Sequence, residues 1–401
     1  MLVVFSKICI FLVQCQAEAI FDRLIQELSD SHLGSVATKL MRKSNQDIRS
    51  FTLAGLNSFH SLFPVIEQKT FTKANFAIAV LGEIIVNQTA WLPHAPKILL
   101  AALLRMDHPK SIIYEAAKIL LQNLLFTLIT RQKKEQSAQA QRYKEIVSLL
   151  ARCRHESVWN TPKQQDFKLD VPNSKMVEKV TRLCVQALNF LPDFSTEFTN
   201  VTLNTASQTN VHRHYVARCL QIFRATYEEN PTVSFPIVEK LTLLLIRFIY
   251  MREDSSQTRV SLEVVDTLLK LIKENESEDL LKFPQIFWIG TTLLQSSLRS
   301  DYLGGICILS AFLDKVDLRT QENVDVLEDS LPSGYFPFPG VAIQLLKGVC
   351  SEKLEAASRN LMSKLVMVPA SFLVDQHTER KMLVFILSLL PSLITPVSST
   401  N

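Results

Sequence analysis

The chain has 401 residues, of which 47% are hydrophobic and 20% are charged, and its formal net charge is +4. Its 9 glycines make up about 2% of the residues, against ~7% in typical proteins, which argues against glycine-rich phosphate loops and sheet folds with many tight turns. The near balance of charge excludes the strongly basic surface on which nucleic-acid binding depends.

The cysteines and the two apolar ends bear on the class of protein. Residues 1–15 are apolar but lack a basic n-region, so we interpret them as a core helix, the first of a fragment of a longer chain, and not as a signal peptide. Residues 382–394 are too short to cross a bilayer comfortably and contain Pro391, so no integral membrane span is expected. The seven cysteines form no CxxC pair, so we expect free thiols: Cys9, Cys15, Cys153, Cys184, Cys219, Cys307 and Cys350.

Helical periodicity runs along almost the whole chain. The first clear stripe places Ile20, Leu24 and Leu28 on one helix face. A second pattern, at 44–63, opens with Ser44 and Asp47 at capping-box spacing. No convincing run of alternating strand residues interrupts the pattern. Further helices are expected at about 70–88, 95–105, 110–130, 137–153, 175–191, 211–229, 235–251, 257–274, 283–298, 300–315, 337–349, 352–367 and 378–394.

Many helices joined by short connections are compatible with two architectures. One is a compact helical domain, and the other is a solenoid of helical hairpins, each of which buries its apolar face against the next. Some helix pairs recur at roughly forty residues, which fits stacking of the HEAT or armadillo type. The predicted fold class is therefore all-α, a HEAT/armadillo-like helical-repeat solenoid.

Three polar stretches interrupt the apolar pattern. Residues 131–145 are basic and are expected to extend a helix into solvent, and residues 154–174 are expected to form a long loop. Residues 192–210 are rich in Ser, Thr and Asn and are not expected to build a core. We therefore expect an N-terminal helical-repeat block at 1–153, a loop-rich connection at 154–210 with one helix at about 175–191, and a C-terminal helical-repeat block at 211–401.

The stretch "TNVHRHYVARCLQIFRATYEENP" (209–231) raises the question of a metal site because it contains His212 and His214. Its apolar residues follow a helical stripe, and on a helix residues two apart point about 200° away from each other, so the two histidines cannot share one ion. The stretch is predicted to be a repeat helix with a basic outer edge. Its candidate partner-docking residues are Arg213, Arg218 and Arg224.

No catalytic, cofactor-binding or metal-binding residues are predicted. Cys153 and His155 could in principle form a nucleophile and base, but no glycine-bearing elbow or third orienting group accompanies them. Asp107 and His108 stand before Pro109, where a capping role is expected. The aromatic segment 331–340 could be a rigid ligand loop but more often such a segment pins a turn onto a core.

Six stretches, in this order, resemble the C-terminal cell-morphogenesis region of the Furry family of giant scaffold proteins, whose fungal members serve polarised growth. They lie within residues 90–395 and their order and spacing carry the resemblance. They read "WLPHAPKILLAALLRMDHPKSIIYEAAKILLQNLL", "HRHYVARCLQIFRA", "EDLLKFPQIFWIGTTLLQS", "ILSAFLDKVDL", "LEDSLPSGYFPFPGVAIQLLKGV" and "MLVFILSLLPSLI".

This resemblance implies a helical solenoid without catalytic activity or cofactors. Family members scaffold NDR/LATS-type kinases and their Mob co-activators, support cortical polarity, cell shape and neurite outgrowth, and in some cases associate with microtubules. It implies a cytoplasmic protein at the cell cortex or at sites of polarised growth. The alternatives are a helical-repeat cargo or transport adaptor and a cysteine hydrolase that uses Cys153 and His155.

Overall fold

The computed structural model places helices over most of the region where the periodicity predicts them. The expected helices at 1–15, 44–63 and 378–394 lie outside the described residues, and so does most of the expected loop at 154–174. Its last four residues, 171–174, belong to a helix, so the loop prediction is wrong for them. The structure describes residues 19–20, 23–24, 73–87, 91–106, 111–130, 136–152, 171–191, 193–208, 213–231, 233–250, 255–333, 338–351, 353–366, 368–369 and 371–374.

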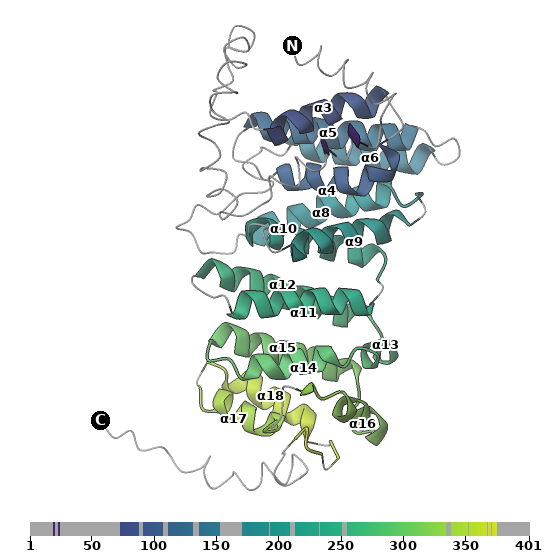
Figure 1. Cartoon of the computed structure of the whole chain (residues 1–401). Coiled ribbons are helices and arrows are strands. Elements are labelled where there is room, and N and C mark those ends of the chain that lie inside the picture. The colour runs from purple at the N-terminus through teal and green to yellow at the C-terminus, as the bar shows by residue number, and fades with distance from the viewer. Residues whose placement is uncertain are drawn as a thin grey trace. The chain divides into compact units, whose positions relative to one another are not determined.

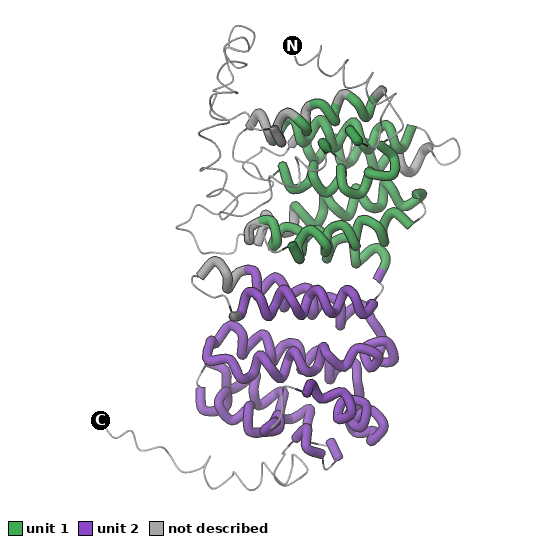
Figure 2. The backbone as a smooth tube through the Cα atoms, in the orientation of Figure 1, with its two compact units in different colours: residues 1–230 green, residues 231–401 purple. Residues whose placement is uncertain are grey.

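The described residues form helices and contain no strand, which confirms the all-α class (Figure 1). The chain divides into two compact units, residues 1–230 and 231–401 (Figure 2). Unit 1 contains α3 (Lys73–Asn87), the 3-10 turn η2 (Leu92–His94), α4 (Ala95–Arg105), α5 (Ser111–Thr130), α6 (Gln136–Arg152), α8 (Val171–Ala187), α9 (Phe194–Ser207) and α10 (Arg213–Glu229). Unit 2 contains α11 (Phe235–Tyr250), α12 (Ser255–Glu274), α13 (Ser277–Leu281), α14 (Gln285–Leu294), α15 (Arg299–Lys315), α16 (Gln321–Asp329), α17 (Val341–Val349) and α18 (Glu355–Leu365).

Unit 2 is a stack of helical hairpins. The pairs α11–α12, α14–α15 and α17–α18 pack as successive layers (Figure 1). Between layers, α14 contacts both α11 and α17, and α15 contacts both α12 and α18. Two rows of helices therefore run through the unit, and each hairpin buries its apolar face against its neighbours, as a helical repeat requires.

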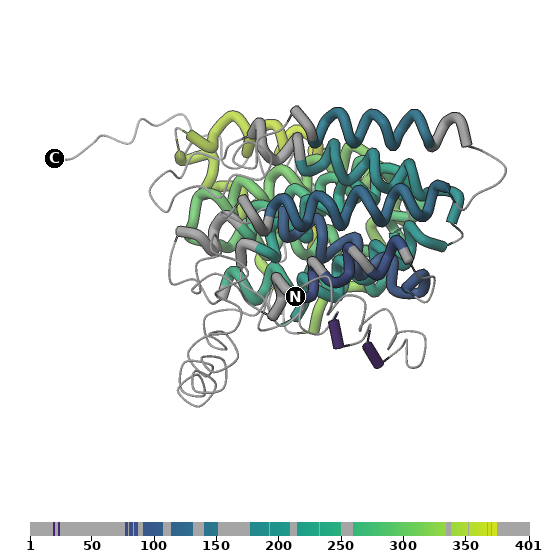
Figure 3. The backbone as a smooth tube through the Cα atoms, turned by 90° about the horizontal axis from the view of Figure 1, so that it is seen from above, coloured from purple at the N-terminus to yellow at the C-terminus, as the bar shows by residue number. Residues whose placement is uncertain are grey.

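Unit 1 follows the same principle around α5 and α10. The helix α5 packs on α3, α4 and α6, and Figure 3 shows α3, α5 and α6 as rods that run side by side. The helix α10 packs on both α8 and α9, and α9 also packs on α4. The helices that the structure describes between Lys73 and Glu229 are thus linked by direct packing within one unit.

Side-chain hydrogen bonds between packed helices recur at sequence separations of about 40–55 residues. In unit 1, Asn123 bonds to the carbonyl of Gly82, 41 residues away, and Arg142 bonds to the carbonyl of Gln186, 44 residues away. In unit 2, the indole of Trp288 bonds to Ser330, 42 residues away, and Lys364 bonds to Ser310, 54 residues away. A recurrence in this range is typical of helical-hairpin repeats of roughly 40–50 residues, while the HEAT or armadillo type stays a prediction.

The stretch 192–210 was expected to be a loop, and that expectation is wrong for most of it. Helix α9 occupies Phe194–Ser207, and it buries Phe194, Phe198 and Leu203. The hydroxyls of Thr202, Thr205 and Ser207 donate to the carbonyls four residues earlier. Because each hydroxyl is satisfied within its own helix, a Ser/Thr-rich sequence can still pack an apolar face.

The predicted domain limits differ from those of the structure. Helices α8, α9 and α10 belong to unit 1, and the division between the units falls at residues 230 and 231. Helices α8 and α9, which fall in the predicted connection, are therefore packed within unit 1.

In the aromatic segment 331–340, the described residue Phe338 packs onto the core of unit 2, which agrees with the commoner structural role of such a segment. The ring of Phe338 is buried and meets Trp288 edge-on with centroids 5.2 Å apart. Among the described residues of this segment, Gly340 adopts a φ of 90°, which suits glycine, directly before α17.

Helices α14 and α15 approach so closely that their contact leaves no room for a side chain at Gly305. A Cβ at that position would lie 2.7 Å from the carbonyl oxygen of Gly290 and 3.0 Å from the side chain of Leu293. A backbone oxygen cannot move aside as a flexible side chain can. This close approach is therefore a fixed element of the packing in unit 2.

We expect Gly305→Ala to lower the free energy of unfolding by about 1–3 kcal/mol, since the two helices must separate. Gly82→Ala is the matched control, because a Cβ there meets nothing within 4 Å; it should leave stability unchanged or raise it by roughly 0.5–1 kcal/mol. Urea unfolding followed by circular dichroism measures both. Equal stability of the two variants would contradict the close packing of α14 on α15.

Candidate partner-binding surface

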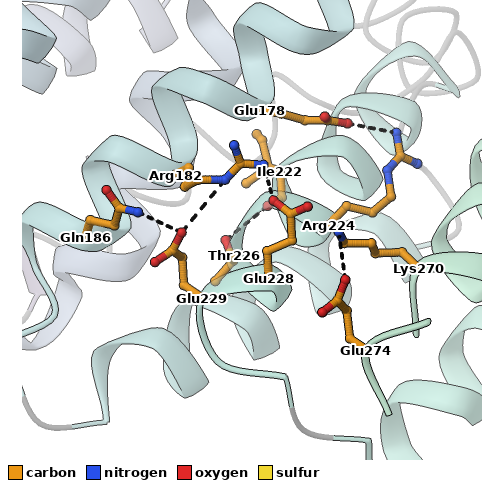
Figure 4. Close-up of polar contacts among 10 residues, drawn as sticks. All are labelled: Glu178, Arg182, Gln186, Ile222, Arg224, Thr226, Glu228, Glu229, Lys270 and Glu274. Carbon is orange, nitrogen blue, oxygen red and sulfur yellow. Dashed lines mark hydrogen bonds and ion pairs between the residues drawn. The ribbon is translucent and has the colours of Figure 1, made fainter. Parts of the chain in front are cut away.

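The polar face of α10 is joined to α8 by a ladder of charged side chains (Figure 4). Arg224 on α10 pairs with Glu178 on α8 at 3.4 Å. One turn further along, Arg182 on α8 pairs with Glu228 and lies 3.8 Å from Glu229. The partners advance together along both helices, so α8 and α10 run in the same direction, as equivalent helices of successive repeats do.

Hydrogen bonds of Gln186 extend this ladder from α10 and α8 to α6. Gln186 on α8 donates from its amide nitrogen to Glu229 at 2.9 Å. The carbonyl of the same residue accepts a hydrogen bond of 2.7 Å from Arg142 on α6. These partly exposed ion pairs attach neighbouring helices to one another. Each pair contributes little to stability alone, and the pairs contribute more as a network.

The structure places the three predicted docking arginines in three different environments. Arg218 is only 2% exposed, so the expectation that it lies on the outer edge is wrong. Arg224 lies on the ladder, with its side chain 11% exposed. The side chain of Arg213 lies outside what the structure describes, and so do residue His212 and the side chain of His214.

The burial of Arg218 has a geometric reason. One guanidinium nitrogen donates to the amide oxygen of Gln221, one turn later, at 2.8 Å. Gln221 is itself 1% exposed, so this hydrogen bond joins two buried polar side chains on α10. The sequence of α10 alone does not predict the burial of Arg218, because the burial depends on the other helices that pack against α10.

A second buried arginine lies at the end of α4. Arg105 is 5% exposed, and two of its guanidinium nitrogens, Nε and Nη2, have no hydrogen-bond partner. Burial lowers the pKa of this guanidinium, and the nearby Tyr215 of α10 partly opposes the shift. Arg105 therefore contributes a desolvated cation and not a satisfied network.

The two buried arginines should respond in opposite ways to removal of their charge. We expect Arg218→Met to lower the free energy of unfolding by about 1–3 kcal/mol, because it strips a donor from the buried Gln221. Arg105→Met should cause no loss and a gain of up to roughly 1 kcal/mol, because it replaces an unsatisfied buried ion with an apolar side chain of similar length.

Thermal and urea unfolding of the two variants, beside the unsubstituted chain, make this comparison. A loss of stability in Arg105→Met as large as that in Arg218→Met would show that Arg105 has a partner that holds it. The comparison also bears on binding studies: a charge reversal at Arg218 is expected to disturb folding, so it cannot report on docking alone.

The described cysteines and histidines do not form a reactive site. Burial raises the pKa of the Cys184 and Cys219 thiols to about 12, so both stay protonated and poorly nucleophilic at neutral pH. Among the described residues, no three His, Cys, Asp or Glu side chains gather as metal ligands do. The pair Cys153 and His155 lies outside the described residues.

An exposed apolar surface on α5 and α6 was missed by the sequence reasoning. Ile119 and Phe126 are each 52% exposed and lie two turns apart on one face of α5. The ring of Tyr143 on α6 lies 5.9 Å from that of Phe126, between centroids. We call Ile119, Phe126 and Tyr143 the α5–α6 patch. Because α5 is apolar on nearly every side, its sequence gave no signal of which face stays exposed.

Two family models match successive parts of the chain. A family model of the cell morphogenesis central region matches residues 37–247, and a model of the cell morphogenesis C-terminal region matches residues 284–401. The chain therefore belongs to the family of cell morphogenesis proteins. The predicted resemblance is confirmed, with the refinement that the first part of the chain matches the central region of the family.

Two curated proteins of yeasts are similar to most of the chain. Cell morphogenesis protein PAG1 of Saccharomyces cerevisiae is 24% identical over 325 residues, which cover 80% of this chain and 13% of that protein. Cell polarity protein mor2 of Schizosaccharomyces pombe is 20% identical over 336 residues, which cover 81% of this chain and 14% of that protein. The chain thus spans about one seventh of these relatives' length.

In the described part of the chain, every helix is too short or too polar to cross a membrane.

Proposed function

We propose that this chain is a non-enzymatic scaffold that acts in cell morphogenesis and polarised growth. Its membership of the cell morphogenesis family is the observation that carries the proposal. The names of the two yeast relatives, a morphogenesis protein and a polarity protein, agree with it. Stacked hairpins provide long, rigid surfaces that bind partners without chemistry of their own.

The partners proposed are NDR/LATS-type kinases with their Mob co-activators, at the cell cortex or at sites of polarised growth in the cytoplasm. This step follows from the resemblance to the Furry family. The surface proposed for them is the α5–α6 patch, because exposed aromatic and aliphatic side chains supply most of the binding energy at protein interfaces. Ile119 and Phe126 have the spacing with which an amphipathic partner helix would engage.

Fewer candidate docking residues remain on α10 than its sequence predicts. With Arg218 buried and Arg224 paired to Glu178, Arg213 is the member of the predicted docking edge that we retain as a candidate. A single change, Arg213→Glu, therefore replaces reversal of all three charges as the test of this edge.

The experiment measures binding of the purified chain to a purified NDR-type kinase–Mob complex by isothermal titration calorimetry. We expect the double variant Ile119→Asp, Phe126→Asp to bind at least tenfold more weakly, since two desolvated apolar contacts are replaced by charges. The matched control is Gln285→Asp, Thr292→Asp, which adds the same charges at exposed positions seven residues apart on α14. This control should bind as the unsubstituted chain does.

Two results would count against the proposal. Absence of heat for the unsubstituted chain, at concentrations up to about 100 μM, would exclude kinase binding by this part of the molecule. Equal affinities of the patch variant and the α14 control would show that the α5–α6 patch is not the binding surface, even if the kinase complex binds.

A further inference from the structure

Helix α11 in unit 2 is apolar on two opposite sides. One side is buried and includes Leu241 and Leu245, and α11 packs on α12 and α14. The other side is exposed although it carries Phe235 and Leu243, each 56% exposed, and Ile246, which is 46% exposed. With about 100° of rotation per residue, these three side chains fall within an arc of about 80°. They therefore form one apolar face along the helix.

The helices beside α11 do not extend this apolar face. The exposed residues of α14 are polar, Gln285 and Thr292. Those of α12, from residue 260 onward, are Asp266 and Lys273. Large apolar side chains gathered on one exposed helix face are typical of a helix that packs on another helix. The face on α11 is therefore suited to a single partner helix.

Two charged residues border this face, and they are placed symmetrically about Leu243. Glu239 stands four residues before Leu243 and is exposed, and Arg247 stands four residues after it and is partly exposed. Within α11, no basic residue stands three or four positions from Glu239, where a helical ion pair would form. The guanidinium of Arg247 lies over the ring of Phe248, 5.0 Å from its centroid.

This pattern is complementary to a second copy of itself in the antiparallel direction. Glu239 and Arg247 each lie about 6 Å from Leu243 along the helix axis, because each residue adds about 1.5 Å. When two copies face each other with Leu243 on a two-fold axis, Glu239 of one copy lies level with Arg247 of the other, and the reverse pair forms on the far side of the axis. A parallel pair would instead bring like charges level with each other.

We propose that the exposed face of α11 binds a second copy of this chain, as an antiparallel helix pair with Leu243 on the two-fold axis. Ile246 packs beside the axis, and Phe235 lies toward the end of the contact. The two reciprocal ion pairs between Glu239 and Arg247 set the direction of the pair.

The expected dimer is weak, with a Kd on the order of 50 μM, because the contact covers little more than one helix on each copy. Self-association through α11 is independent of the kinase partners proposed above, since those are assigned to α5 and α6 in unit 1. Failure of either proposal therefore leaves the other intact.

Sedimentation equilibrium of the full chain, at concentrations from about 5 to 300 μM, measures this association. We expect a monomer–dimer equilibrium for the unsubstituted chain. Glu239→Arg places a second cation level with Arg247 at both ends of the contact, and Arg247→Glu places a second carboxylate level with Glu239. Each single variant should therefore dimerise about tenfold more weakly.

A mixture of the two single variants tests the register of the pair. In a dimer formed by one chain of each variant, both contacts again join opposite charges. We expect the equimolar mixture to form heterodimers with an affinity within about threefold of that of the unsubstituted chain. A contact elsewhere on the chain gives no such rescue.

Asp329→Arg is the matched control, because it makes the same change of charge at an exposed position of α16. This variant should dimerise as the unsubstituted chain does. Circular dichroism checks that every variant is folded. If Arg247→Glu lowers the helix content, Arg247→Gln takes its place and should weaken dimerisation in the same direction, by about threefold.

Each of the following results would overturn the proposal. A monomer at every concentration would show that a second copy does not cover the face. Equal dimerisation of the unsubstituted chain and the single variants would place the contact elsewhere, and a mixture that does not recover dimers would contradict the antiparallel register. A mixture that dimerises about tenfold more tightly than the unsubstituted chain would indicate a parallel pair. Flotation of a monomeric chain with phosphatidylcholine–phosphatidylserine vesicles, lost in Leu243→Asp, would assign the face to a membrane surface.

Discussion

Contact between successive helical layers is the constraint on which the rest of this structure depends. A hairpin of two short helices leaves one apolar face uncovered, and it becomes stable when the next hairpin covers that face. In both units the layers meet through side-chain hydrogen bonds between residues about 40–50 positions apart. Polar groups such as Arg218 and Thr202 can lie buried in this packing because each donates a hydrogen bond within its own helix.

The sequence predicts the helices well and their environment less well. Apolar periodicity located α10 and α15 closely because each needs only local information. It missed α9, whose Ser and Thr hydroxyls bond to their own helix. Domain limits depend on contacts between distant residues, which local periodicity does not carry. The candidate docking arginines of α10 show the same difference between local structure and environment. The sequence identifies Arg213, Arg218 and Arg224 as one edge of a helix, but α8 and the neighbouring layers decide which of them meets water.

A stacked array also accounts for how the family could act without catalysis. Ion pairs such as Arg224–Glu178 hold neighbouring helices in a fixed register, so exposed side chains on them keep a fixed spacing. The two 52% exposed side chains of α5, which we propose as part of a binding surface, stand on a single helix, so the helix itself fixes their spacing before any partner binds. The buried thiols of Cys184 and Cys219, held protonated by burial, belong to the same packing and not to a reactive centre.

Native-state hydrogen–deuterium exchange of α8, α9 and α10 tests most directly whether the layers stabilise one another. Since α10 packs on both other helices, we predict that the central amides of all three exchange through one opening reaction, with the same free energy and the same dependence on urea. Exchange of α9 at the rate of an unfolded peptide, while α8 and α10 stay protected, would contradict this account.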